Sequence, residues 1–80
     1  MSEPTLAQLG AAIRILREER SLSVEALADE ANLHWTSISR IERGKQNATW
    51  VALSQIAAVF EVEMQELARL AAEQPGTVGR

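Results

Sequence analysis

The fold is decided by residues 24–44, which read VEALADEANLHWTSISRIERG. Apolar residues recur at helical spacing on both sides of Asn32, at Leu27, Ala28, Ala31, Leu33, Ile38 and Ile41. Asn is the residue other than glycine that best tolerates the left-handed conformation in which helices end, and Gly44 is a second stop signal. Two short helices joined by such a turn predict a helix-turn-helix over about residues 24–43.

Further helices are expected on both sides of this segment. Thr5 and Gln8 fit a capping box that starts a helix after Pro4. Ser23 and Thr49 are suitable N-caps for later helices, and the third helix is expected over Leu33–Arg43. The remaining apolar stripes are Leu6, Leu9, Ile13 and Leu16; Leu53, Ile56, Ala57 and Phe60; and Met64, Leu67, Leu70 and Ala71. No segment alternates as a strand does, so we expect an all-α domain of five helices.

Length and composition narrow the function classes. The chain has 80 residues, of which 46% are apolar, with no cysteine and one histidine. These counts exclude disulfides, thiolate metal sites and multi-histidine metal sites, and no cofactor is expected. We expect one domain over residues 1–73, whose last helix is ended by Pro75-Gly76, and a flexible tail over residues 74–80. With no signal pattern and no membrane-spanning run, a cytoplasmic location is expected.

Charge is distributed unevenly along the chain. The net charge is −3. Residues 34–56, however, carry Arg40, Arg43 and Lys45 against Glu42, a sum of +2. This basic island indicates either a polyanionic partner or an ordinary solvated surface of mixed charge, because local field matters more than total charge.

Several short motifs together resemble the lambda-repressor-like, Cro-type helix-turn-helix family. They are Leu9-Gly10, Ile13-Arg14, Leu16-Arg17, Leu22-Ser23, Leu27-Ala28 and, most specifically, the run from Ile38 to Gly44. The likeness covers about residues 6–70. It implies a five-helix domain that binds double-stranded operator DNA, usually as a two-fold homodimer. Standalone chains of this length are similar to phage Cro-like repressors and to controller proteins of restriction–modification systems, so the resemblance implies either repression or activation.

The resemblance makes the third helix, from residue 34 to 43, the one that reads bases in the major groove. It implies base contacts by Trp35, Thr36, Ser37 and Arg40. Arg40 has the geometry to fork onto the O6 and N7 atoms of guanine. The alternatives are a phosphate contact or a salt bridge for Arg40, and packing against a neighbouring helix for Trp35.

The resemblance also implies contacts to the DNA backbone and one structural ion pair. The implied backbone contacts are Ser23, His34, Arg43, Lys45, Gln46 and Asn47. Arg17 and Glu42 match the pair that ties the first helix to the end of the reading helix. His34 replaces a common serine cap, so it is either a phosphate contact or a poor cap. Two further departures are Val24, which cannot anchor phosphate as the usual glutamine does, and Glu61, which replaces a glycine and could strain its turn.

A dimer interface is expected in the C-terminal third. Its candidates are Phe60, Val62, Met64, Leu67 and Leu70. Five large apolar residues exceed what a short fifth helix needs for docking, and exposed apolar clusters usually mark interfaces. The alternative is that all five complete the core of a monomer.

Two other function classes compete with DNA binding. An antitoxin-like protein-interaction module would use the same fold, with the acidic, apolar C-terminal third as its binding face. An enzyme is not expected, because helical spacing brings no serine, His34 and acidic residue together as a catalytic triad.

Overall fold

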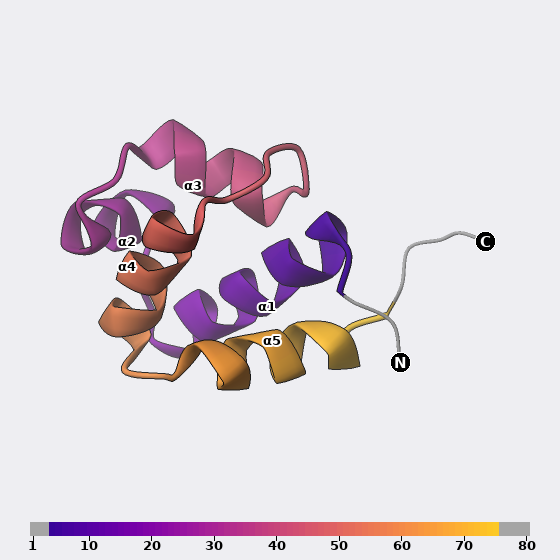
Figure 1. The fold of residues 1–80 in the computed structure, drawn as a ribbon. Helices are drawn as coiled ribbons and strands as arrows, with labels where there is room; N and C mark the ends of the chain where they lie inside the picture. Colours follow the sequence, from indigo (N-terminus) through magenta and orange to yellow (C-terminus); the bar gives the residue numbers. More distant parts are fainter. Residues whose placement is uncertain (1–3, 76–80) are drawn as a thin grey trace.

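The computed structural model describes residues 4–75, and in that range it is built from helices without strands (Figure 1). The helices are α1 Leu6–Glu19, α2 Val24–Ala31, α3 Trp35–Glu42, α4 Trp50–Phe60 and α5 Met64–Glu73. The prediction of an all-α, five-helix domain is therefore confirmed. No helix within residues 4–75 is long and apolar enough to cross a membrane.

Local hydrogen bonds set the helix starts that the sequence predicts. Thr5 and Gln8 form the expected capping box, in which each side chain accepts from the other residue's backbone N–H. The hydroxyls of Ser23 and Thr49 accept from the N–H groups of Ala26 and Ala52, both at 3.0 Å. These contacts satisfy N–H groups that have no partner inside the helix.

The third helix is shorter than the predicted span of Leu33–Arg43. It begins at Trp35, because His34 is still extended (φ −77°, ψ 140°), and it ends at Glu42. Leu33 lies in the turn, where its N–H donates to the carbonyl oxygen of Ala28 at 2.8 Å and closes the end of α2. Its half-buried side chain packs on the core from that turn.

A residue with positive φ lies in each of the four turns between the helices. Ser21 (φ 54°) follows α1, while Asn32 (φ 60°) ends α2 and Gly44 (φ 70°) follows α3, the last two as expected. Glu61 (φ 59°) ends α4, so the strain anticipated where glycine is missing is present in the backbone. A residue other than glycine or asparagine held in this region costs about 1 kcal/mol or more.

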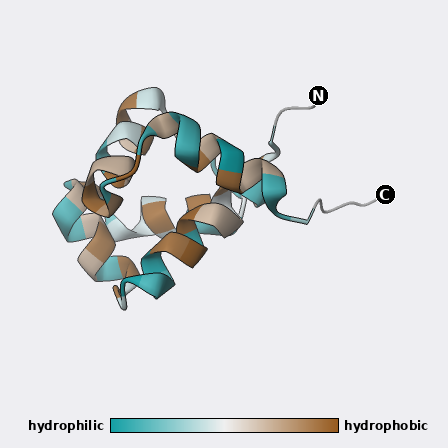
Figure 2. Cartoon of the chain, turned by 90° about the horizontal axis from the view of Figure 1, so that it is seen from below, coloured by the Kyte–Doolittle hydropathy of each residue, from teal (hydrophilic) through white to brown (hydrophobic). Residues whose placement is uncertain are grey.

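One core joins the helices. Helix α1 packs against α3 and α5, while α2 packs against α3 and α4. Apolar and polar segments alternate along each helix in Figure 2, as amphipathic helices require. The largest fully buried side chains are Ile13, Leu27, Ile38, Ile56, Phe60 and Leu67.

Gln74, the residue after α5, is held by two hydrogen bonds. Its backbone oxygen accepts from Nε2 of Gln8 at 2.8 Å, and its own Nε2 donates to the carbonyl oxygen of Leu70 at 3.1 Å. Helix α5 stops because the residue before Pro75 is driven to extended geometry, and Gln74 has ψ 150°. Gly76 and the rest of the predicted tail lie outside the described residues.

Candidate nucleic-acid interface

The two central helices form a helix-turn-helix. Ala28 and Ala31 of α2 are buried, so their small side chains let α3 cross close by. Asn32 turns the chain, and Ile38 and Ile41 then anchor α3 on the shared core. The opposite side of α3 faces outward.

Arg17 and Glu42 hold α3 in place from the side of α1. Nε of Arg17 donates to Oε2 of Glu42 at 2.6 Å, and Nη2 donates to Oε1 at 3.0 Å. The remaining Nη1 donates to the carbonyl oxygen of Leu22 at 2.8 Å. The two side chains are 12% and 6% exposed, and the hydrogen bonds with Glu42 raise the pKa of Arg17. This two-pronged geometry fixes orientation as well as charge.

Gly10 permits the close approach of α1 to the end of α3. A Cβ atom built there would overlap the backbone carbonyl oxygens of Ile41 and Glu42. Helix α1 and the end of α3 thus approach closely enough for Arg17 to reach Glu42. The sequence motif Leu9-Gly10 carried a family likeness, and the structure supplies its physical reason.

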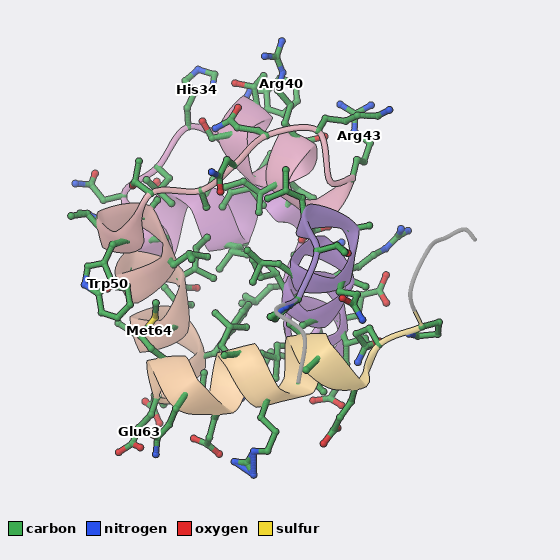
Figure 3. The ribbon with its side chains drawn as sticks, turned by 45° about the vertical axis from the view of Figure 1, so that its right-hand side comes forward. His34, Arg40, Arg43, Trp50, Glu63 and Met64 are labelled. Atoms are coloured by element: carbon green, nitrogen blue, oxygen red, sulfur yellow. The ribbon has the colours of Figure 1, made fainter. Side chains whose placement is uncertain are left out.

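The outward side of α3 carries three of the residues expected to read bases. Trp35 is 49% exposed, so it does not pack into the core. Its ring stacks on that of His34, with ring centroids 6.1 Å apart. Arg40 is exposed one turn along, and Figure 3 shows it pointing outward on the same side as His34. Thr36, which follows Trp35 on α3, is half-buried.

His34 is the N-cap of α3. Its Nδ1 accepts from the backbone N–H of Thr36 at 3.3 Å and lies 2.6 Å from the Thr36 hydroxyl oxygen. An accepting Nδ1 requires the neutral ring to carry its proton on Nε2, the far side of the ring. The cap and a phosphate contact are therefore compatible, since they use different ring nitrogens.

The loop after α3 extends the outward face. Arg43 and Lys45 are exposed on either side of Gly44, and Asn47 is exposed further on. The backbone N–H of Lys45 donates to the carbonyl oxygen of Arg40 at 2.9 Å, which folds the loop back along α3. Gln46 and Ser37 are half-buried, and Ser23 is exposed at the start of α2.

The basic island of residues 34–56 presents more positive charge to solvent than its formal sum of +2 implies. Its carboxylate, Glu42, is occupied by Arg17. Among the described residues, Arg40, Arg43 and Lys45 enter no ion pair. Three cations on one edge of an otherwise acidic chain make a local positive field suited to phosphates.

The residues predicted for the dimer interface do not form one exposed patch. Phe60 and Leu67 are 2% exposed, so they belong to the monomer core. The guanidinium of Arg20 also covers Phe60, 5.1 Å from the ring centroid. Val62, Met64 and Leu70 are half-buried. The prediction was wrong for Phe60 and Leu67 because periodicity alone does not show which apolar face another helix covers.

The comparisons place this geometry in a known family. The family described as "Helix-turn-helix domain" matches residues 8–70. The restriction-modification controller protein C.AhdI from Aeromonas hydrophila is 32% identical with a TM-score of 0.76, over 78% of this chain and 94% of that one. The clp gene regulator ClgR from C. glutamicum is 25% identical with a TM-score of 0.80, over 89% of this chain and 92% of that one.

A further solved structure, titled "C.Esp1396I bound to a 25 base pair operator site", is 31% identical with a TM-score of 0.75, over 85% of this chain and 90% of that one. No curated protein sequence matches significantly. The chain belongs to the helix-turn-helix domain family, and its class is that of small DNA-binding transcription regulators. Within that class it is similar to the controller proteins of restriction–modification systems.

Proposed function

We propose that this protein is a sequence-specific regulator that reads double-stranded DNA with α3 and binds a palindromic operator as a dimer. The observation that carries the proposal is the outward face of α3. Arg40 is exposed there, Trp35 and His34 flank the helix start, and the unpaired cations of the following loop lie alongside.

The proposed contacts are of two kinds: those that read bases and those that position the protein on the DNA backbone. Arg40 forks onto guanine O6 and N7, and the Thr36 methyl group meets a thymine methyl. Trp35 and Ser37 complete the base-facing side. Ser23, His34, Arg43, Lys45, Gln46 and Asn47 hold the sugar–phosphate backbone and set the register.

The small size of the domain supports the binding of two copies to one operator. The longest dimension of the chain is 35 Å. The operator bound by C.Esp1396I has 25 base pairs, and at 3.4 Å a step it is about 85 Å long. A two-fold dimer would place its α3 helices about 34 Å apart, one helical turn of DNA, on matching half-sites.

The test begins by selecting bound sequences from random DNA and measuring affinity by fluorescence anisotropy. Arg40→Ala is expected to weaken the selected site by about 1–3 kcal/mol and to relax preference at one guanine. Arg14→Ala removes the same charge from the solvent side of α1 and serves as the matched control. An equal loss on every sequence would make Arg40 a phosphate contact, and no loss would remove α3 from the interface.

A further inference from the structure

His34 is joined to Thr36 by two contacts at the surface, where α3 begins. Its Nδ1 atom lies 3.3 Å from the backbone nitrogen of Thr36 and 2.6 Å from the hydroxyl oxygen of the same residue. The imidazole ring also stacks on Trp35, with the ring centroids 6.1 Å apart and the planes inclined by 28°. Stacking at this separation restrains the ring and keeps Nδ1 turned toward Thr36.

The position of the proton in the shorter contact follows from the longer one. A backbone N–H can only donate, so the Nδ1 atom that accepts from it carries a lone pair and no proton. A bare Nδ1 at 2.6 Å from a hydroxyl oxygen makes the hydroxyl the donor. The single proton of the Thr36 hydroxyl is thereby used inside the protein, and only the lone pairs of its oxygen are left for DNA.

An oxygen without a free proton distinguishes between base edges in the major groove. Adenine N6 and cytosine N4 are amino donors there, whereas guanine O6 and thymine O4 are acceptors. A freely rotating hydroxyl pairs with either kind, but a hydroxyl that can only accept pairs with amino groups alone. The methyl group of Thr36 adds a second preference, because among the standard pairs only A·T also presents a methyl group.

We propose that His34 is a specificity-determining residue, which makes the Thr36 hydroxyl an acceptor and directs it to the adenine amino group of an A·T pair. The proposal rests on the proposed function, because it requires α3 to lie in the major groove. Figure 3 shows His34 and Arg40 pointing outward on the same side. Arg40 then reads a guanine, and Thr36, held by His34, adds an A·T pair to the same half-site.

Capping by itself does not require a histidine at this position. A serine oxygen accepts from the same kind of backbone N–H group and caps helices well. A serine hydroxyl, however, both donates and accepts, so it does not fix the direction of a hydrogen bond with the Thr36 hydroxyl. His34→Ser therefore separates the cap from the control of Thr36.

Nuclear magnetic resonance on the free protein tests where the proton lies. His34 is the single histidine of the chain, so signals from its two ring nitrogens belong to one residue. Two-bond correlation spectra of the neutral ring are expected to show the proton on Nε2 and a bare Nδ1. Thr36→Val removes the hydroxyl and keeps the branched shape, and is expected to shift the Nδ1 resonance. A proton on Nδ1, or an Nδ1 resonance that is the same in Thr36→Val, would overturn the proposal.

Selection from random DNA tests which base pair Thr36 reads. Thr36→Val identifies this pair as the position whose preference changes, and in the parent the pair is expected to be A·T. Replacing its adenine by purine, which lacks the N6 amino group, is expected to weaken binding by the parent roughly 2- to 12-fold, the net contribution of one hydrogen bond. A G·C pair at this position, or an unchanged affinity with purine, would contradict the assignment.

The role of His34 is measured as a ratio of affinities at this position. The two operators carry A·T, or guanine opposite 5-methylcytosine, which keeps the methyl group but places the O6 acceptor where adenine has N6. The preference for A·T is expected to fall roughly 2- to 12-fold in His34→Ser, because the freed hydroxyl can donate to O6. The thermal melt is expected to stay unchanged, since serine keeps the cap. In the Thr36→Val background, His34→Ser is expected to leave the ratio as it is.

The ratio separates base reading from phosphate binding. Arg43→Ala is the matched control, because losing a phosphate contact is expected to weaken both operators by the same factor. A parent that binds no DNA would refute the proposed function. A parent that binds DNA, and whose preference for A·T is unchanged in His34→Ser, would refute the role of His34 and leave the proposed function standing.

Discussion

Replacing Arg17 by methionine is expected to remove much of the stability of the domain. The change deletes both hydrogen bonds to Glu42 and the one to the carbonyl oxygen of Leu22. It leaves a carboxylate whose side chain is 6% exposed without its partner. Removing one partner of a buried pair typically costs about 3–5 kcal/mol.

That loss is large for a chain of this length. At about 0.05–0.15 kcal/mol per residue, 80 residues hold roughly 4–12 kcal/mol of folding free energy. A domain of this size loses about 4–8 °C of melting temperature per kcal/mol, so Arg17→Met should melt at least about 12 °C lower. Glu42→Gln keeps one acceptor oxygen but loses the charge, and is expected to cost about 2–3 kcal/mol.

The assay is thermal and urea unfolding followed by circular dichroism, with Arg14→Met as the control. Arg14 pairs with Glu18 on the exposed side of α1, so its loss should cost less than about 0.5 kcal/mol. The double variant Arg17→Met, Glu42→Leu should lose at least about 2 kcal/mol less than the sum of the losses of Arg17→Met and Glu42→Leu measured singly, because no charge is left unpaired. Single variants that melt with the parent, or losses that simply add, would refute the reasoning.

Three further outcomes are expected. Gly10→Ala should lower the free energy of unfolding by about 2 kcal/mol in urea, because the Cβ atom of the new alanine meets the backbone of α3. Helix propensity alone predicts the opposite, a gain in stability, so a stabilised variant would contradict the close crossing of α1 and α3. Glu61→Gly should raise stability by about 1 kcal/mol in thermal melts by relieving φ 59°, and an unchanged melting temperature would mean that the turn is unstrained. Arg43→Ala and Lys45→Ala should each reduce the salt dependence of DNA affinity by about one unit without changing sequence preference, and unchanged slopes would remove this loop from the interface.

Local sequence patterns are enough to predict the helices and most of their ends. The capping box of Thr5 and Gln8, the caps at Ser23 and Thr49 and the left-handed Asn32 all appear where the residues predict them. Each depends on groups within about four residues of one another, so local hydrogen bonding and backbone sterics suffice. The pairing of Arg17 with Glu42 was accessible in another way, through the likeness of both positions to a family motif.

Which apolar residues face water depends instead on packing between helices that are distant in sequence. Trp50 precedes Leu53 by three positions, so its spacing places it on the buried stripe of α4 with Phe60. The structure buries Phe60 against the core and leaves Trp50 largely exposed beside a groove. Periodicity defines a face of a helix, but burial depends on whether a helix distant in sequence reaches that end of the face. The shortening of α3 to Trp35–Glu42 has a similar cause, because Leu33 packs on the core from the turn and His34 stays extended to cap the helix.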